Sequence, residues 1–157
     1  MFEIRMATEA DAELIGVHRR KMFIEMGQPD DSAMQAMVSS FVPWVRQKLT
    51  DRHYLGWLAV KNGEVVGGGG MLLLDFVPHW RDPKPLRAYL LNFYVSPEAR
   101  GQGLAKRLLQ TAVEEARRRD IGVVALHASS AGRPIYEAAG FEASNEMMLM
   151  VENQKPD

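Results

Sequence analysis

The 157-residue sequence contains no cysteine, no long apolar run and no excess of charge of either sign. The lack of cysteine excludes disulfides, thiolate nucleophiles and cysteine-ligated zinc or iron–sulfur sites, and it fits a chain that works in the cytoplasm. No apolar run approaches the roughly 20 residues that span a bilayer, and the start MFEIRMATEADAE lacks the basic and apolar stretches of a signal peptide, so no membrane partner is expected. The 19 Lys and Arg nearly balance the 20 Asp and Glu, which leaves no field to attract nucleic acid.

The remaining composition is that of an ordinary globular protein. Hydrophobic residues make up 46% of the chain and charged residues 25%, which argues against disorder and fibrous repeats. The length suits one compact domain, and the sequence shows no internal repeat, low-complexity segment or linker. We therefore expect residues 1–157 to form a single domain.

Hydrophobic periodicity and turn residues predict an α+β layer structure around a mixed sheet. The expected strands are residues 2–7, 54–61, 64–75, 88–95, 123–128 and 141–151. The expected helices are residues 8–26, 32–49, 104–119 and 133–139. The second helix should be broken or kinked at Pro43, which has no N–H to donate. Asn62 and Gly63, between the second and third strands, are typical of a two-residue hairpin turn.

Glycine and proline mark two further segments. Gly67–Gly70 lie inside an expected strand, where glycine indicates a bulge or the close approach of another group; the wall of a site and clearance for a helix are equally good explanations. Residues 76–87 contain three prolines and should form an exposed loop. His79 and Asp82 in this loop are only two potential metal ligands, so no metal site is expected.

The segment Arg100-Gly101-Gln102-Gly103-Leu104-Ala105 joins the apolar strand 88–95 to an amphipathic helix. A helix start presents backbone N–H groups without intrahelical partners and a partial positive charge, which together stabilise an anion. Gly101 and Gly103 would let the backbone approach such a ligand, and Arg100 adds a permanent cation. The segment therefore predicts a phosphate-binding loop.

Neither standard nucleotide fingerprint fits this loop. It contains no G-x-x-x-x-G-K-[ST], and Lys106 stands where G-x-G-x-x-G requires its third glycine. The chain instead resembles the GNAT superfamily of acetyl-CoA dependent N-acetyltransferases, whose signature Gln/Arg-x-x-Gly-x-Gly/Ala is met by Arg100, Gly103 and Ala105. The segment FYVSPEARGQGLAKRLL is similar to the family's cofactor-binding strand, turn and helix, and RPIYEAAGF is similar to its C-terminal helix.

The resemblance covers nearly the whole chain and implies a fold and an activity. The fold would be a three-layer structure in which about four helices flank a mixed, mostly antiparallel central sheet of about six or seven strands. The activity would be that of an acyltransferase, an N-acetyltransferase that uses acetyl-CoA as co-substrate and a primary amine as acceptor. Direct attack by the amine suits a chain with neither cysteine nor a G-x-S-x-G elbow.

The resemblance also implies roles for particular residues. Tyr136 would protonate the leaving thiolate, and its ordinary pKa near 10 keeps it protonated at pH 7. The implied cofactor-binding residues are Phe93, Tyr94, Val95, Arg100, Gly101, Gln102, Gly103, Leu104, Ala105, Lys106 and Ser130. Residues 100–106 would take the pyrophosphate, and the strand 88–95 would offer main-chain bonds to the pantetheine arm and an N–H near Asn92–Tyr94 to the oxyanion.

In the family this strand splays from the next one, residues 123–128, which leaves a slot for the arm. Ser129 and Ser130 would either bond the arm or cap the following helix.

No residue of this chain matches a family base. Some members place a glutamate on or beside the strand that here is AYLLNFYV, but this strand has Asn92 and no carboxylate. Glu25, Asp75 and His79 remain candidates, and proton transfer through water to bulk solvent is an equal alternative. The other histidines are interpreted as structural, with His18 on a helix surface, His53 in a loop and His127 on a strand.

Two functions follow from these observations. One is the N-acetyltransferase, and the other is a non-catalytic acyl-CoA binding or sensor module with the same fold, which the missing carboxylate keeps open. The sequence does not define the acceptor amine, and it leaves both a monomer and a homodimer open.

Overall fold

A computed structural model of the chain describes residues 1–151. Its strands are β1 (Glu3–Met6), β2 (Tyr54–Lys61), β3 (Glu64–Asp75), β4 (Leu86–Val95) and β5 (Val124–Leu126). Its helices are α1 (Ala12–Glu25), α2 (Ser32–Thr50), α3 (Leu104–Arg118) and α4 (Arg133–Ala138), with short 3₁₀ turns η1 (Glu9–Asp11) and η2 (Pro97–Ala99). Met1–His127 form one compact unit, which contains the sheet, and a second unit begins at Ala128.

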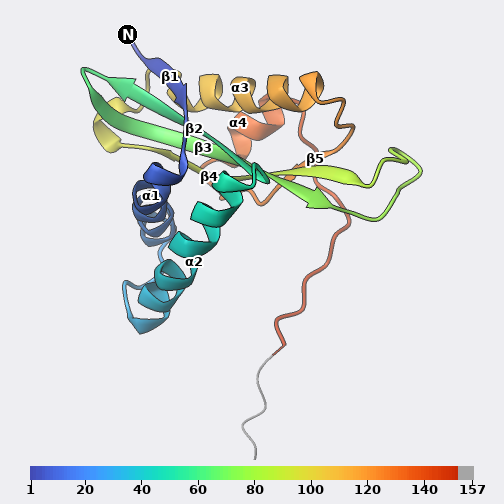
Figure 1. Ribbon diagram of the computed structural model, residues 1–157, viewed down its shortest axis with the longest axis horizontal. Coiled ribbons are helices and arrows are strands. Elements are labelled where there is room, and N and C mark those ends of the chain that lie inside the picture. The colour runs from blue at the N-terminus through green and yellow to red at the C-terminus, as the bar shows by residue number, and fades with distance from the viewer. Residues whose placement is uncertain (152–157) are drawn as a thin grey trace, which may run out of the picture. The chain divides into compact units, whose positions relative to one another are not determined.

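The five strands form one mixed sheet in the order β1-β2-β3-β4-β5 (Figure 1). Antiparallel pairing joins β1 to β2, β2 to β3 and β3 to β4, whereas β4 and β5 are parallel. Helices α1 and α2 pack on one face of the sheet and α3 packs on the other. The α+β class is therefore as predicted. No helix in residues 1–151 is both long and apolar enough to cross a membrane.

The sheet has five strands within residues 1–151, not the predicted six or seven. Residues 141–151 were expected to close the sheet but contain no strand. The side chains of Met147–Val151 are 68–94% exposed, so the apolar pattern that suggested a strand is not accompanied by burial. The prediction was wrong because a strand depends on a neighbouring edge and a buried face, which a local pattern does not encode.

Helix α1 starts four residues after the predicted start at residue 8 and ends one residue before the predicted end at residue 26. The Thr8 N–H donates to Asp11 Oδ2 at 2.8 Å, as in a capping box, although the first turn is 3₁₀ and α1 itself starts at Ala12. At the other end Gly27, with φ +94°, donates its N–H to Ile24 O at 3.0 Å, as in a Schellman motif. The chain then turns sharply toward α2.

Helix α2 runs without interruption from Ser32 to Thr50 with Pro43 inside it, so the predicted break is absent, whereas the alternative of a kink stays a prediction. Pro43 has no N–H for the carbonyl of Ser39, which removes one hydrogen bond from the helix. The buried side chains of Phe41, Val45 and Leu49 flank this position and hold the helix on the core. Tertiary packing here outweighs the local preference of proline.

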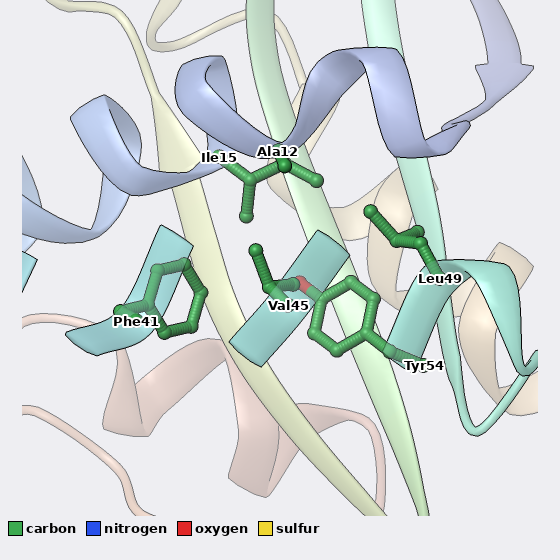
Figure 2. Close-up of a cluster of buried hydrophobic side chains, with 6 residues drawn as sticks. All are labelled: Ala12, Ile15, Phe41, Val45, Leu49 and Tyr54. Atoms are coloured by element: carbon green, nitrogen blue, oxygen red, sulfur yellow. The ribbon is translucent and has the colours of Figure 1, made fainter. Parts of the chain in front are cut away.

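The core beneath α1 and α2 is a cluster of six buried side chains (Figure 2). They are Ala12, Ile15, Phe41, Val45, Leu49 and Tyr54, each at most 8% exposed. Full burial of a large apolar side chain contributes about 1.5–3 kcal/mol, so this cluster is a main attachment of the two helices to the sheet. It also positions the Tyr54 hydroxyl, which accepts a 3.0 Å bond from Asn92 Nδ2 on β4.

The β2–β3 hairpin matches its predicted bounds and turn. Asn62 (φ +52°) and Gly63 (φ +80°) have the positive φ values that a type I′ turn requires. Gly56 and Gly70 face each other across the two strands, and the Tyr54 ring lies over both. A Cβ on Gly70 would overlap the Tyr54 hydroxyl, so glycine is required there by close packing.

The other three glycines of β3 are also closely covered. A Cβ on Gly67 would lie 2.8 Å from Tyr94 O, one on Gly68 would lie 2.9 Å from Leu58 Cδ2, and one on Gly69 would lie 2.7 Å from the Phe93 ring. The side chains and backbone of β2 and β4 therefore occupy the space above β3. The closest groups thus belong to the neighbouring strands and not to a helix, which is neither of the two explanations given from the sequence.

Residues 76–85 form the expected exposed loop, in which His79 and Asp82 make an isolated bridge. Asp82 is only 6% exposed, and its Oδ2 accepts from the Gly122 N–H at 3.0 Å, which ties the loop to the turn after α3. His79 Nδ1 accepts from the Arg81 N–H at 3.1 Å. Within residues 1–151, no group of three or more His, Cys, Asp or Glu could hold a metal ion.

Candidate functional site

Strand β4 continues past the end of its neighbour β5. The parallel pairing comprises Ala88 with Val124, Tyr89 with Ala125 and Leu90 with Leu126, and β5 then ends. It is shorter than the predicted strand 123–128 and only half-buried, so that prediction was wrong in length and burial. The part of β4 from Leu91 to Val95 is paired with β3 alone among the described residues, and its other edge is open.

A β-bulge at Asn92 interrupts the pairing of β4 with β3. Leu91 pairs with Gly70 and Tyr94 pairs with Gly68, so Asn92 and Phe93 together oppose Gly69. Asn92 has φ +60°, and asparagine tolerates this left-handed conformation better than most residues. The extra residue changes which main-chain groups of β4 face the open edge.

The direction of the main-chain groups follows from two hydrogen bonds on either side of the bulge. Before it, the Ala88 N–H donates to Val123 O, toward β5; after it, the Ser96 N–H donates to Val66 O, toward β3. Because successive residues alternate in direction, Tyr94 also faces β3, whereas Phe93 and Val95 face the open edge. The bulge thus directs two N–H groups to the side where β5 has ended.

The side chain of Asn92 holds the bulge from within the protein. Asn92 is 4% exposed, donates from Nδ2 to Tyr54 Oη at 3.0 Å, and accepts at Oδ1 from Arg19 Nη1 at 2.8 Å. Burial raises the pKa of Tyr54 to about 12, so its phenol stays neutral. Arg19, Asn92 and Tyr54 therefore form one polar chain that links α1, β4 and β2, in which Asn92 and Tyr54 are buried and Arg19 is half-buried.

Beyond η2 the strand leads into the glycine loop at the start of α3. Gly101 and Gly103 have φ values of +73° and +77°, and no atom lies within 4 Å of a Cβ built on either. The first intrahelical bond runs from the Arg107 N–H to Gly103 O at 3.1 Å. The N–H groups of Leu104, Ala105 and Lys106 therefore lie ahead of the helix hydrogen bonds, at the positive end of α3.

Arg100 connects this loop to α1 and to β4. Its Nη2 lies 2.8 Å from both carboxylate oxygens of Glu25, and its Nε donates to Val95 O at 2.9 Å. The carboxylate of Glu25 balances the charge of Arg100, which we expected to serve a phosphate directly. The structure thus gives Arg100 the role of holding the loop against β4.

In the second unit, α4 starts from a serine turn and carries Tyr136. Ser129 Oγ accepts from the Gly132 N–H at 3.1 Å, so Ser129 supports the helix start, which was one of its two expected roles. The Tyr136 ring packs edge-on to Phe141 with centroids 5.9 Å apart. Burial raises the pKa of Tyr136, so the phenol keeps its proton at neutral pH.

His18 is buried on α1, contrary to its interpretation as a helix-surface residue. It is 5% exposed, and its ring packs on Tyr94 with centroids 4.9 Å apart. Its position on the face of α1 that packs against β4 explains the error, since α1 has apolar residues on several sides. Burial, with a smaller effect from Lys21, lowers the pKa of His18 to about 4.

The buried His18 should make the protein less stable in acid. The unfolded chain takes up the proton near the ordinary pKa of about 6.5, whereas the folded chain resists it to about 4, so stability is complete above pH 6.5 and declines between pH 6.5 and 4. The loss over this range is of the order of 3 kcal/mol. Urea unfolding at pH 7.5 and 4.5 should show this loss in the wild type and much less in His18→Phe. The exposed His53, replaced in His53→Phe, is the control; the same pH dependence in His18→Phe and the wild type would contradict the assignment.

Sequence reasoning missed three residues near the site. The side chain of Asn92 was noted only for lacking a carboxylate, and its backbone only as part of the segment 92–94 expected to face the oxyanion, although an asparagine inside an apolar strand signals a bulge or a buried partner. Arg19 and His18 gave no such signal, because a polar residue on an amphipathic helix is ordinarily exposed. Their burial depends on where α1 crosses β4, which is a tertiary property.

Comparison with known proteins gives one consistent result. A family model described as the acetyltransferase (GNAT) family matches residues 19–141. N-acetyltransferase 8 from Rattus norvegicus is 32% identical over 104 residues, which are 64% of this chain and 45% of that protein. The chain therefore spans less than half the length of this relative.

Two solved structures are similar over nearly their whole length. A GCN5-related N-acetyltransferase from Ralstonia eutropha JMP134 has a TM-score of 0.92 and 33% identity, covering 96% of this chain and 99% of its own. A predicted acetyltransferase from Clostridium acetobutylicum, crystallised with acetyl-CoA, has a TM-score of 0.87 and 27% identity, covering 96% of each chain.

Proposed function

The chain belongs to the acetyltransferase (GNAT) family, and from this premise we propose that it moves an acetyl group from acetyl-CoA to a primary amine. The amine nitrogen bonds to the carbonyl carbon of the thioester, the C–S bond breaks, and the thiolate takes a proton from Tyr136. Starting from an ammonium ion, the products are the N-acetyl amine, CoA and one proton released to solvent. No covalent bond to the protein is required.

One observation carries the proposal: the open edge of β4 leads directly into the glycine loop at the start of α3. A ligand that joins an amide-bearing arm to a diphosphate could use both, with the arm along the strand and the diphosphate at the loop. Acetyl-CoA has this construction. Its presence in the similar Clostridium acetobutylicum structure supports the same cofactor here.

The N–H groups named above divide between two tasks. Those of Phe93 and Val95 bind the pantetheine arm, and the Phe93 N–H, beside the bulge, is also the best placed to stabilise the oxyanion. Those of the loop residues Gly101–Lys106 bind the pyrophosphate, while Arg100 holds the loop in place. The side chains of Tyr94, Gln102 and Ser130 remain proposed cofactor contacts.

The proton of the acceptor ammonium most simply leaves through water. Glu25 is engaged on both oxygens by Arg100, and His79 already accepts a backbone bond in the β3–β4 loop. His18, with a pKa of about 4, is too weak a base for an ammonium whose ordinary pKa is near 10. Asp75 stays the remaining carboxylate candidate, at the end of β3.

The second candidate function is a module that binds acyl-CoA without transferring the acyl group. The absence of a carboxylate from β4 favours it, because no side chain on that strand can take the proton. The two functions share the cofactor site and differ in turnover. If acetyl-CoA releases its thiol in the presence of any amine of a broad panel, the chain is an acetyltransferase and not a binding module.

We also propose that residues 1–157 act as one domain. The family match runs from residue 19 to residue 141 and so crosses the boundary between the two compact units at Ala128. A limited proteolysis experiment with and without acetyl-CoA would test this, since protection of the boundary by the cofactor is expected for a single functional domain.

The cofactor loop is tested by Gly103→Ala. A Cβ at φ +77° costs about 1–2 kcal/mol and would stand between the ligand and the N–H groups, so the Kd for CoA measured by calorimetry should rise at least about tenfold. Gly63→Ala is the matched control, because Gly63 has φ +80° in equally open space at the hairpin turn. Equal CoA affinity in both variants would refute the loop assignment.

A further inference from the structure

Arg19 on α1 carries a half-buried positive charge, and no carboxylate of residues 1–151 pairs with it. Its Nη1 donates to Asn92 Oδ1, and its Nε has neither a hydrogen-bond partner nor exposed surface within residues 1–151. The ionisable groups that face it are the phenols of Tyr54 and Tyr89, and burial lowers the pKa of Arg19. A guanidinium removed from water is normally paired with an anion.

Aromatic rings enclose this guanidinium on two sides. Its Cζ lies 4.9 Å from the centroid of the Phe23 ring and 5.1 Å from that of Phe41. The rings attract a cation by about 1–2 kcal/mol, but they supply no negative charge. They exclude water, so an anion that reached Arg19 would interact with it more strongly than at the surface.

An open groove lies against one of these rings, because Phe23 lines it whereas Arg19 does not. Phe23, which packs on Arg19, also lines a groove of about 290 Å³ between the end of α1 and the start of α2. Met34 and Met37 on α2 line the same groove and make part of its wall apolar and adaptable, and Gln28 and Asp31 make another part polar. The volume suits a ligand of the size of an amino acid, with its apolar part between the two helices.

Asn92 links the charge to the proposed transfer site. Its side chain bonds Arg19, and its backbone forms the bulge beside the Phe93 N–H. A group held by the guanidinium therefore lies within one side chain of the place proposed for the thioester. An amine separated from a carboxylate by one or two carbon atoms can occupy both places at once.

We infer that Arg19 binds a carboxylate of the acceptor, and that the enzyme acetylates small amines that also carry a carboxylate, as amino acids do. The inference rests on the proposed function and specifies its substrate class. With Nη1 taken by Asn92 and Nε buried, Nη2 is the guanidinium nitrogen left to donate to a carboxylate oxygen. Polycationic acceptors, such as basic peptides, would meet repulsion from the same charge.

The test compares each amino acid with its own amide. Rates of thiol release from acetyl-CoA would be measured for the α-amino acids, β-alanine and the corresponding amides, with wild type and Arg19→Gln. Glutamine keeps an uncharged polar group near the position of Nε and lacks the two terminal nitrogens of the guanidinium. For the best amino acid, wild-type kcat/KM should exceed that of the amide about 100-fold, and Arg19→Gln should abolish this preference, so that the rate for the amino acid falls about 100-fold further than the rate for the amide.

Controls separate this role from support of the fold. Arg20→Gln changes the neighbouring arginine, which pairs with Asp30 at the surface, and should keep the preference. An equal fall for acid and amide in Arg19→Gln would show that Arg19 only positions Asn92 and would overturn the inference. Wild-type turnover of amides as fast as acids would overturn it and leave the acetyltransferase standing. No thiol release with any amine would overturn the proposed function and this inference together.

Discussion

Replacing Tyr136 with phenylalanine should lower kcat about 100-fold while acetyl-CoA affinity stays within about twofold. The departing thiolate has a conjugate acid with a pKa near 8.5, so it leaves more easily when a proton is delivered as charge builds on sulfur. Burial raises the pKa of Tyr136 and keeps this proton in place at neutral pH. Phenylalanine retains the ring that packs on Phe141 and removes only the hydroxyl.

Stopped-flow thiol release under saturating acetyl-CoA measures the chemical step of this variant. The loss of rate in Tyr136→Phe should be smaller with an acetyl donor whose thiol is more acidic than CoA, because that thiolate departs without a proton. A purely structural role for the hydroxyl would lower the rate equally with acetyl-CoA and with this second donor. Phe141→Leu serves as the control, because it alters the packing of Tyr136 and keeps the hydroxyl. Full turnover in Tyr136→Phe would remove this residue from the mechanism.

Elements that depend on local chemistry were predictable from the sequence. The Asn62-Gly63 turn needs two positive φ values, and the hairpin around it has its predicted bounds. On α3, the residues that recur every three or four positions, Leu104, Leu108, Ala112 and Ala116, are all buried as expected. The glycine loop lies between β4 and α3, where its N–H groups precede the helix hydrogen bonds.

Elements that depend on distant partners were not predictable. The local preference of Pro43 predicts a broken or kinked helix, yet α2 is continuous across this residue because its neighbours pack in the core. The apolar pattern of residues 141–151 suggests a strand, yet no strand forms there. Arg19 and His18 look like surface residues of α1, and only the crossing of α1 over β4 buries His18 and half-buries Arg19.

The bulge at Asn92 shows why the site itself needs the fold. Its backbone is held by Arg19 from α1 and by Tyr54 from β2, and Tyr54 in turn lies over two glycines. Four segments far apart in the sequence thus determine the direction of two N–H groups on β4. No short stretch of the sequence contains all four segments. Some of them are recognisable in the sequence, as a run of glycines or as an asparagine in an apolar strand.

Gly70→Ala should therefore destabilise the fold and damage the site in one step. The new Cβ would overlap the hydroxyl of Tyr54, a residue only 2% exposed that has no room to swing aside. We expect a loss of about 3 kcal/mol in urea unfolding and a fall in Tm of roughly 6–12 °C. The Kd for acetyl-CoA should rise as well, because a displaced Tyr54 withdraws its hydrogen bond from Asn92 and loosens the bulge.

A double-mutant cycle with Tyr54→Leu identifies the cause. Leucine is shorter than the tyrosine ring and vacates the space above Gly70, so adding Gly70→Ala to Tyr54→Leu should cost little further stability, with a coupling energy of at least about 2 kcal/mol. The two single variants and the double variant should all bind acetyl-CoA weakly, since each lacks a correctly placed Tyr54 hydroxyl. Additive losses of stability would show that Gly70 is constrained by something other than this ring, and unchanged cofactor affinity in Gly70→Ala would disconnect the bulge from the site.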